Sequence, residues 1–479
     1  MEDTASMKFM NIWCYDIEIY PNLFTVGFEN MDTGERFIFE ITERIDHGPY
    51  LWNFLQFLIR SRAKMVGYNN LRFDYVLIHE FLTIGAVRPV TALDMYLKGQ
   101  AIIDAKHGDW THSVAEWHHL IQQVDMMVLN GFKGPRATSL KKLEIAMRST
   151  NVKDLPIKPG EHVPRDQIEG MITYMCWDIS ETAKFAKKTW DNVEFRQSLD
   201  DKLGGRRSRI NWDDVRIGSE YLLDELRASG VRTHMNRKAI QTTWPDGIVL
   251  ADILLPVEFD DPGLQGIYRF FQSATVLPDK IKGFFADLSA TVGGLKMDFG
   301  TGGLHGAIPH TTFRATGDRI IQLRDVVSYY PRIAVANGWY PTHLGPIFTE
   351  KYDDLFQQRK QHKKGTPENL LFKLGLNGSF GKTGDKYSPL RDESYMLKVT
   401  INGQLLLARL TEVLMRIASL TVIQVNTDGV AYICDKADEP QADAICEWWE
   451  QITGLSLGTE NYSLFAQRDV NNYFAIEVD

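Results

Sequence analysis

The N-terminal part of the chain carries acidic residues within apolar segments. In CYDIEIY, Asp16 and Glu18 lie two residues apart in a strand pattern, which directs both side chains to the same face. Adjacent carboxylates repel one another unless a cation lies between them. Oxygen ligands with open positions suit Mg²⁺ or Mn²⁺, with which a nuclease can activate water and stabilise a leaving oxygen. Taken alone, a D-x-E pattern is more often a solvated strand face.

Two later segments place an acid beside polar or aromatic side chains. YNNLRFDYVLI (68–78) has Asn70 four residues before Asp74, with Phe73 between them. The apolar flanks make burial of this carboxylate costly unless it is paired or bound to a metal. In IEGMITYMCWDISETAKF (168–185), the helical apolar spacing places Tyr174 and Asp178 on one face, where a phenol and a carboxylate can hold one water.

The C-terminal half carries a second set of acids. An apolar strand is predicted from residues 319–323 onwards, with Asp325 near its end and Pro331 shortly after it. LTVIQVNTDGVAYICD (420–435) predicts a β-hairpin with Asp428 in its Thr-Asp-Gly turn. These two carboxylates are candidates for a second metal pair.

A helix is predicted between these acids, in TPENLLFKLGLNGSFGKTGD (366–385), where a Thr can cap and a Pro occupies the first position. Lys373, Asn377 and Phe380 share one face of it, at i, i+4 and i+7. Gly375 and Gly378 should each cost this helix roughly 0.5–1 kcal/mol relative to Ala. They indicate close approach by something flat, and a base pair would fit.

The ordered motifs D-x-E, N-x-x-F-D and Y-x-x-x-D resemble the three exonuclease motifs of proofreading polymerases with the RNase H-like (DnaQ-like) fold. The resemblance implies that two metal ions bind to four acids and that Tyr174 orients the attacking water. The implied metal ligands are Asp16, Glu18, Asp74 and Asp178.

Contacts with the DNA end are implied by the same resemblance. Asn70 and Phe73 would contact the frayed 3′ end. SLKKL (139–143) resembles a single-strand-binding motif of the small bacteriophage polymerases, which makes Ser139 and Leu140 candidate ligands of the primer end.

The segment DVVSYYP (325–331) resembles motif A of B-family DNA polymerases, D-x-x-S-L-Y-P, with Tyr329 in place of Leu. On that match Asp325 binds both catalytic metals and the Val326 carbonyl binds one of them. Tyr330 underlies the sugar and excludes a ribose 2′-hydroxyl. Without the motif, a core tyrosine is the simpler interpretation of either Tyr.

The predicted helix resembles motif B, K-x-x-x-N-S-x-Y-G, with Gly378 for Ser and Phe380 for Tyr. Lys373 would neutralise the triphosphate, assisted by Arg359 and Lys363 from a preceding basic helix. Asn377 and Phe380 would line the nascent base pair.

The hairpin turn resembles motif C, Y-x-D-T-D-S, with Asp428 as the second catalytic carboxylate. Asn426 replaces the first Asp of that motif and Gly429 replaces its Ser. RDVNNYFAI (468–476) resembles the primer-binding K-x-Y motif, with Tyr473 retained and Asn471 in place of Lys. The sequence ends six residues after Tyr473, where a thumb normally follows in this family. Three explanations are open for the missing thumb: a truncated product, a thumb supplied by another chain, or weak binding of duplex DNA.

The expected fold is a multidomain α/β and α+β protein with an RNase H-like exonuclease domain, a B-family palm and fingers, and a short or absent thumb. A polar segment, 196–215, is the candidate linker, and the glycine-rich stretch 292–307 could join the two halves. The expected boundaries are 1–195 exonuclease, 196–310 linker and N-terminal palm region, 311–350 palm with motif A, 351–385 fingers with motif B, and 386–479 palm with motif C and the start of a thumb region.

The composition, 479 residues with 44% apolar and 24% charged side chains, indicates a globular protein of two or three domains. A net charge of −9 argues by itself against a nucleic-acid partner, because phosphates bind Lys and Arg. Basic runs nevertheless occur at 141–148, 204–210 and 359–364, and a metal-dependent site itself needs carboxylates. A solvated surface is the alternative for each run.

The four cysteines, Cys14, Cys176, Cys434 and Cys446, are scattered without a CxxC pair or zinc-ligand spacing, so reduced core thiols are expected. No apolar run reaches the roughly 20 residues that span a bilayer, and the N-terminus lacks the features of a signal peptide. We therefore expect a cytoplasmic protein that does not enter a membrane.

The function expected from these motifs is template-directed DNA synthesis with 3′→5′ proofreading, using two Mg²⁺ ions, or Mn²⁺, in each active site. The partners expected are primer-template DNA, dNTPs and a separate thumb or processivity subunit. Only 48 residues separate Asp325 from Lys373, and 55 separate Lys373 from Asp428, which leaves little room for the insertion of protein-primed enzymes. An exonuclease, or a DNA-binding accessory protein with an inactive palm, is the alternative.

Overall fold

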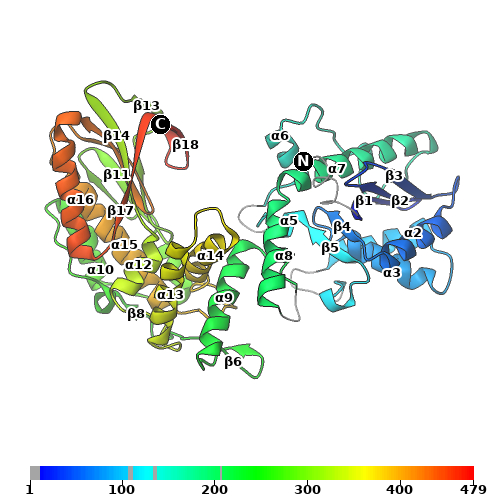
Figure 1. The fold of residues 1–479 in the computed structure, drawn as a ribbon, viewed down its shortest axis with the longest axis horizontal. Coiled ribbons are helices and arrows are strands. Elements are labelled where there is room, and N and C mark those ends of the chain that lie inside the picture. Colours follow the sequence, from blue (N-terminus) through cyan, green and yellow to red (C-terminus); the bar gives the residue numbers. More distant parts are fainter. Residues whose placement is uncertain (1–10, 106–111, 133–136, 205–207, 479) are drawn as a thin grey trace. The chain divides into compact units, whose positions relative to one another are not determined.

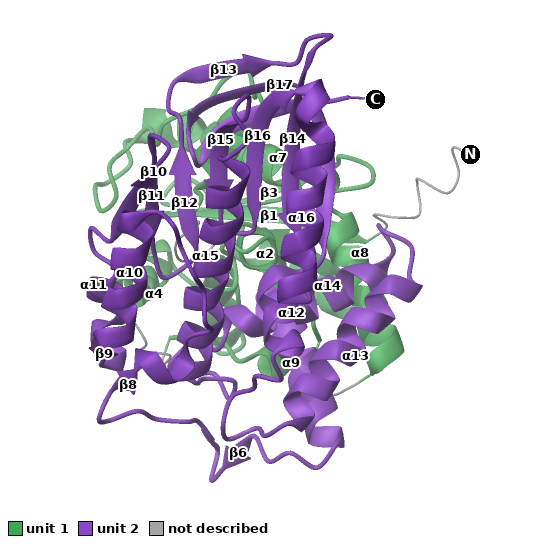
Figure 2. Cartoon of the chain, turned by 90° about the vertical axis from the view of Figure 1, so that its left-hand side faces the viewer, with its two compact units in different colours: residues 1–214 green, residues 215–479 purple. Residues whose placement is uncertain are grey.

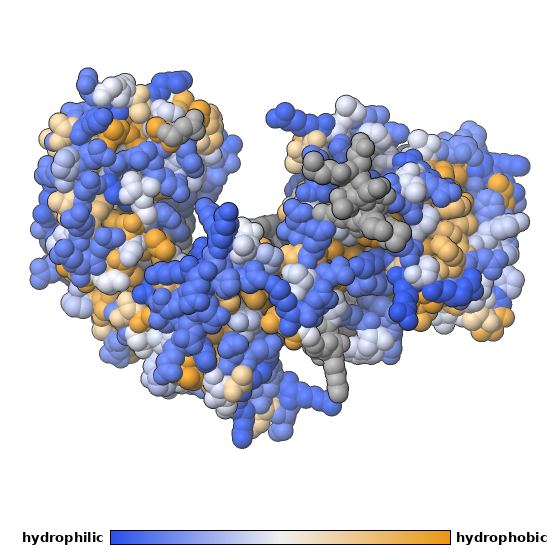
Figure 3. Space-filling model, viewed as in Figure 1, coloured by the Kyte–Doolittle hydropathy of each residue, from blue (hydrophilic) through white to orange (hydrophobic). Residues whose placement is uncertain are grey.

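The computed structural model describes residues 11–105, 112–132, 137–204 and 208–478, which fall into two compact units, 1–214 and 215–479 (Figure 2). Each unit combines helices with a β-sheet, which confirms the expected mixed α/β multidomain class. None of the described helices is long and apolar enough to cross a membrane. The surface of each unit that is in view is mainly hydrophilic (Figure 3). Part of the basic run 204–210 lies outside the described residues.

One five-stranded sheet organises the first unit, in the order β3-β2-β1-β4-β5. β1 pairs antiparallel with β2 and parallel with β4, so it lies at the centre. The strand predicted around Asp16 and Glu18 is confirmed as β1. The strands are β1 Ile12–Tyr20, β2 Leu23–Asn30, β3 Arg36–Ile41, β4 Lys64–Gly67 and β5 Gln122–Asp125.

Helices cover both faces of this sheet, with α7 on one side and α2 and α3 on the other (Figure 1). Alternate residues of β1 therefore enter different cores: Trp13 packs with α2 and α3, whereas Cys14 packs with α7. The helices of the unit are α2 Gly48–Arg60, α3 Asp74–Gly85, α4 Ala92–Asp104, α5 Met126–Leu129, α6 Leu140–Ala146, α7 Ile168–Lys188 and α8 Asp191–Leu203.

The second unit is built on a nine-stranded antiparallel sheet, in the order β10-β11-β12-β15-β16-β14-β17-β13, with β18 also paired to β17. The hairpin predicted over 420–435 is confirmed as β15 and β16. The strands are β10 Ser289–Val292, β11 Leu295–Phe299, β12 Leu304–Ala307, β13 Thr311–Arg314, β14 Arg319–Val326, β15 Thr421–Asn426, β16 Gly429–Asp435, β17 Leu457–Asp469 and β18 Asn472–Glu477.

α15 and α16 run across one face of this sheet (Figure 2). From β14, Gln322 donates a hydrogen bond to Glu439 of α16, and Arg324 forms an ion pair with Asp443 of the same helix. Asp325 is the next residue, so strand alternation directs it to the opposite face. The helices of this unit are α9 Asp214–Ala228, α10 Pro262–Ser273, α11 Ile281–Phe284, α12 Tyr329–Ala336, α13 Ile347–Gln361, α14 Pro367–Gly381, α15 Glu393–Leu414 and α16 Glu439–Thr453.

Of two expectations about connecting segments, one is wrong in part and the other is wrong. The two units divide after Asp214, which lies inside the expected linker 196–215. Residues 196–203 of the expected linker continue α8, where Arg196 is buried and donates to three backbone carbonyls. The glycine-rich stretch 292–307 does not join the halves, because it lies within the second unit and contributes to β10, β11 and β12. All of its glycines except Gly306, which lies in β12, occupy the turns of this meander, with positive φ at Gly293 and Gly294.

Candidate active sites

The acids of the first unit meet where α7 crosses the central strand. Asp16 and Glu18 lie on the face of β1 that α7 covers, and Asp178 lies on α7. Gly27 pairs with Asp16 across the sheet, and a Cβ at this glycine would lie 2.5 Å from the Ile179 Cδ1 atom. The absence of a side chain there lets α7 approach the strand closely.

Three of these carboxylates converge. Asp16, Glu18 and Asp178 each offer one oxygen, and the three oxygens lie within 4.8 Å of one another. The Tyr174 side chain, one helical turn before Asp178, interacts with that carboxylate. We call Asp16, Glu18, Asp178 and the neighbouring Asp74 the carboxylate cluster.

Burial raises the pKa of every member of the carboxylate cluster, and repulsion by other members adds to it at Asp16 and Glu18. Desolvation is the largest cause, and it raises the pKa of Glu18 to about 8, that of Asp74 to about 7 and that of Asp178 to about 6. The pKa of Asp16 lies well above its usual range, because the other three acids add to its desolvation. A site with several acids that resist ionisation is suited to a divalent cation, which offsets the repulsion.

The predicted DNA contacts Asn70 and Phe73 lie in the turn that leads to Asp74 at the start of α3. Asn70 is fully buried and donates a hydrogen bond to the Gln123 Oε1 atom at 3.0 Å, which also accepts from Tyr15. Phe73 is partly buried against the core. Asn70 therefore supports the turn from inside, and contact with a DNA end stays a prediction.

Asp125 is a positioning residue that the sequence did not reveal. Its carboxylate is fully buried at the end of β5 and accepts hydrogen bonds from four backbone N–H groups. Two of them belong to Asn69 and Leu71 in the turn before Asp74, and two belong to α5. An acid that directly precedes an apolar helix start, as in VDMMVL, was the available signal.

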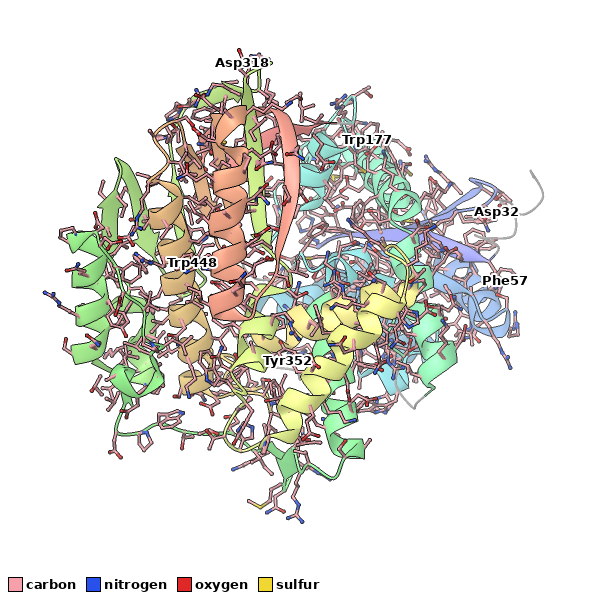
Figure 4. The ribbon with its side chains drawn as sticks, turned by 60° about the vertical axis from the view of Figure 1, so that its left-hand side comes forward. Asp32, Phe57, Trp177, Asp318, Tyr352 and Trp448 are labelled. Atoms are coloured by element: carbon pink, nitrogen blue, oxygen red, sulfur yellow. The ribbon has the colours of Figure 1, made fainter. Side chains whose placement is uncertain are left out.

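Ser139 and Leu140 open α6, which packs against α7. The exposed Ser139 hydroxyl caps the helix by accepting from the Lys142 N–H at 3.4 Å. Further along α6, the buried Glu144 accepts a hydrogen bond from Trp177 of α7, which Figure 4 labels. These contacts hold the start of α6 near the carboxylate cluster.

A pocket of about 490 Å³ in the second unit brings together most of the predicted residues of that half. We call it the strand-end pocket, because Asp325 ends β14 and Asp428 lies in the turn between β15 and β16. Its lining comprises Asp325, Val326, Ser328, Tyr329, Tyr330, Pro331, Arg359, Lys373, Asn377, Phe380, Thr427 and Asp428.

Backbone pairing fixes the two acids of the strand-end pocket beside each other. The Val326 N–H donates to the Asp428 carbonyl at 2.7 Å, and Asp325 pairs with Gly429. Asp428 is exposed at the tip, yet surrounding atoms and the charge of Asp325 raise its pKa to about 6. Desolvation and Glu460 raise the pKa of Asp325. Paired carboxylates with raised pKa values fit a divalent cation here as well.

Basic and polar side chains reach the pocket from α13 and α14. Arg359 donates a hydrogen bond to the Ser328 hydroxyl at 3.0 Å, while Lys373 and Asn377 are exposed on α14. The predicted α14 begins after Thr366, which caps it as expected. Tyr352 of α13, labelled in Figure 4, donates to a carbonyl of α14 and ties the two helices together.

The expected close approach at the α14 glycines is present, but its partner is protein. A Cβ at Gly378 would lie 2.9 Å from the Val215 carbonyl oxygen of α9, and one at Gly375 would lie 3.2 Å from Leu355 of α13. Both glycines are buried. The interpretation that they accommodate a base pair is therefore wrong, because helix packing already fills this space.

The two tyrosines of the strand-end pocket differ in environment. Tyr329 is buried and donates to the Gly403 carbonyl, so it is a core residue. Tyr330 lies against Phe380, with ring centroids 4.8 Å apart, and donates to the Gly302 carbonyl at 2.6 Å. The glycine-rich stretch thus fixes the Tyr330 ring, a role that sequence reasoning missed.

Two predicted residues lie away from this pocket. Lys363 is exposed beyond the end of α13, in the turn before α14, so its assignment to the basic helix was wrong. Tyr473 lies on β18, with its ring stacked on Phe465 at 5.1 Å, beside a separate open groove of about 610 Å³ that Arg468 also lines. The structure therefore does not gather these two side chains around Asp325 and Asp428.

Comparisons with known proteins give a fold and no sequence relative. No family model matches the chain, and no curated protein matches it. Among solved structures, the fold is similar to that of the family B DNA polymerase from the hyperthermophilic archaeon Pyrobaculum calidifontis, with a TM-score of 0.53 and 15% identity. That match covers 97% of this chain and 58% of the archaeal polymerase.

The chain thus has a polymerase-like fold, and it spans little more than half the length of that neighbour. The predicted resemblance to B-family polymerases is confirmed for the fold. The similarity to bacteriophage enzymes in particular stays a prediction.

Proposed function

We propose that this chain is a template-directed DNA polymerase that adds dNTPs to a primer 3′ end by two-metal phosphoryl transfer. The observation that carries the proposal is the convergence of Asp325 and Asp428 with Arg359 and Lys373 in one pocket. Two acids can bind the metal ions of a nucleoside triphosphate, and two cationic side chains can bind its phosphates. The polymerase-like fold supports the same conclusion.

The proposed metal site consists of Asp325, Asp428 and the carbonyl of Val326. Mg²⁺ bound there would neutralise the phosphates and lower the pKa of the primer 3′-hydroxyl. The chain's own residues hold the reactants: Lys373 and Arg359 bind the triphosphate, and the hydrogen bond to Ser328 keeps the guanidinium of Arg359 directed into the pocket.

Sugar selection is assigned to Tyr330. Its hydroxyl is held by the Gly302 carbonyl and its ring is supported by Phe380, so the ring forms a rigid wall of the pocket. A rigid wall can reject the extra 2′-hydroxyl of a ribonucleotide by its bulk. Asn377, on the same face of α14 as Phe380, is assigned to the nascent base pair.

The first unit is proposed to be a 3′→5′ proofreading exonuclease. Asp16, Glu18, Asp74 and Asp178 would hold two Mg²⁺ or Mn²⁺ ions, and the Tyr174 hydroxyl with the Asp178 carboxylate would position the attacking water. Because the acids of the carboxylate cluster resist ionisation, cleavage should depend strictly on a divalent cation.

We assign the exonuclease to the first unit, 1–214, because the expected boundary at 195 would divide α8, and within the second unit we assign 311–350 and 386–479 to a palm and 351–385 to fingers. The proposed partners are primer-template DNA and dNTPs. The groove beside Tyr473 is the proposed contact for the primer strand, because an exposed aromatic ring and Arg468 lie together there.

The test is a 5′-labelled primer on a longer template, incubated with Mg²⁺ with and without dNTPs. Asp428→Ala should abolish extension and retain shortening, whereas Asp16→Ala should do the reverse. Asp318→Ala and Asp32→Ala, exposed acids of the same two units, are the matched controls (Figure 4). Shortening without extension under any condition would leave a nuclease with an inactive palm and refute the polymerase proposal.

A further inference from the structure

Asn426 stands where the polymerase motif has a carboxylate, and its side chain makes a contact that a carboxylate cannot make. Its Nδ2 atom donates a hydrogen bond to the Val470 carbonyl at 3.2 Å, in the turn between β17 and β18. Its Oδ1 atom accepts from the Thr427 hydroxyl at 3.3 Å, and that hydroxyl also contacts the His305 Nε2 atom at 3.1 Å. Asn426 therefore links three segments beside Asp428.

The β17–β18 hairpin is attached to β15 at a second point. The Gln467 side chain donates to the Ile423 carbonyl at 3.0 Å and to the Ile308 carbonyl at 2.7 Å. Gln467 is buried and pairs with Tyr473 across the hairpin. Pairing of β17 with β13 and β14 holds the body of the hairpin, the Gln467 side chain attaches it to β15, and the Asn426 contact holds its tip.

We propose that Asn426 is a positioning residue that fixes the tip of the β17–β18 hairpin to the catalytic turn, and thereby sets the primer 3′ end relative to Asp428. This inference rests on the proposed polymerase function. Thr427 has a positive φ of 57°, so the turn is strained and its conformation depends on such side-chain contacts.

An aspartate at this position would reverse the contact. A carboxylate has no hydrogen to donate, so two acceptors would face each other at about the present Asn426–Val470 separation. It would also add negative charge next to Asp428. Asn426→Asp, which restores the acid of the polymerase motif, should therefore weaken primer binding and not improve it.

The experiment compares the wild type with Asn426→Asp and Asn426→Leu, two substitutions of similar size that both lose the donor. Asn337→Asp is the matched control, because Asn337 also donates to a backbone carbonyl, at 2.8 Å, and lies at the far end of α12. The readouts are KM for primer-template, KM for dNTP and amide hydrogen exchange over 468–474.

Both Asn426 variants should raise KM for primer-template about tenfold, as expected for one lost hydrogen bond with an unpaired partner. KM for dNTP should stay unchanged, because Arg359 and Lys373 come from other elements. Exchange at the hairpin tip should accelerate, while the Gln467 side chain still holds β17 to the Ile308 and Ile423 carbonyls. Asn337→Asp should match the wild type in all three readouts.

An Asn426→Asp enzyme with wild-type KM and exchange would overturn the inference. Impairment by Asp alone, with Leu like the wild type, would show a charge effect and overturn it as well. If the wild type extends no primer, the polymerase proposal fails, and the exchange comparison still decides whether Asn426 holds the hairpin.

Discussion

Replacing Asp74 by Asn should stabilise the metal-free protein at alkaline pH. Asp74 is only 7% exposed, and burial raises its pKa to about 7, whereas an unfolded chain has a pKa of about 3.9. The folded state therefore retains a proton that the unfolded state releases. The stability from this group is complete below about pH 4 and is lost as the pH rises towards 7.

A pKa of about 7 in the folded state and about 3.9 in the unfolded chain corresponds to at most about 4 kcal/mol at pH 8. Asn keeps the shape of the side chain and removes the cost of ionisation, so Asp74→Asn should gain part of this amount at pH 8 and much less at pH 5. For a unit of this size, each 1 kcal/mol raises Tm by about 2–4 °C.

The assay is thermal and urea unfolding from pH 5 to 8, in EDTA and then in Mg²⁺. Mg²⁺ should stabilise the wild type more than the variant, which has lost one ligand, and the variant should lose nuclease activity. At a cation concentration of about 100 Kd, binding contributes about 2.7 kcal/mol. The stability difference between the two proteins should therefore shrink or reverse in Mg²⁺.

Asp125→Asn is the control, since Asp125 is also a buried acid of this unit. Its oxygens accept four backbone hydrogen bonds, so an amide would leave N–H groups unpaired and destabilise the protein by about 1–3 kcal/mol. A metal-free Asp74→Asn protein that is no more stable than the wild type at pH 8, or whose advantage does not grow with pH, would refute the reasoning.

Three further substitutions test other parts of the structure. Gly378→Ala should lower the free energy of unfolding in urea by about 1–3 kcal/mol, because the new Cβ would meet the Val215 carbonyl. Gly381→Ala on the same helix is the control: its Cβ has open space, so the free energy of unfolding should stay unchanged or rise by up to about 1 kcal/mol. Tyr330→Val should reduce discrimination between dNTPs and rNTPs by roughly tenfold or more in single-nucleotide incorporation; unchanged discrimination would exclude Tyr330 as the selecting wall. Tyr174→Phe should slow single-strand digestion about tenfold, the effect of losing one hydrogen bond, and a wild-type rate would remove its assigned role.

Local patterns were sufficient to predict the elements that carry the acids. Alternation around Asp16, the Thr-Pro start of α14 and the turn residues at Asp428 each predicted the element that the structure contains. These features depend on neighbours along the chain, which the sequence displays directly. The order of the acids also predicted that they would form two separate groups.

Contacts between distant segments were not predictable in the same way. The sequence indicated that something approaches Gly378 closely, but it did not show that the backbone of α9 is the partner. Gln123 and Asp125 support the turn before Asp74 from a strand about 50 residues later, and no local pattern connects them. The glycine-rich stretch was visible, yet its role in holding Tyr330 requires the sheet that brings β12 beside β15.

The two departures from the polymerase motif at the hairpin turn have different physical reasons, crowding at Gly429 and a hydrogen bond at Asn426. A Cβ at Gly429 would lie 3.0 Å from the Leu323 Cδ1 atom and 3.2 Å from the Arg324 carbonyl, so a serine there would require the neighbours to move. At position 426 the side chain must donate a hydrogen bond to the Val470 carbonyl of the β17–β18 turn, which Asn can do and Asp cannot. Neither substitution removes a carboxylate from the strand-end pocket, because Asp325 and Asp428 both remain on its surface. The altered motif is therefore compatible with a two-metal site whose surroundings, and not whose ligands, have changed.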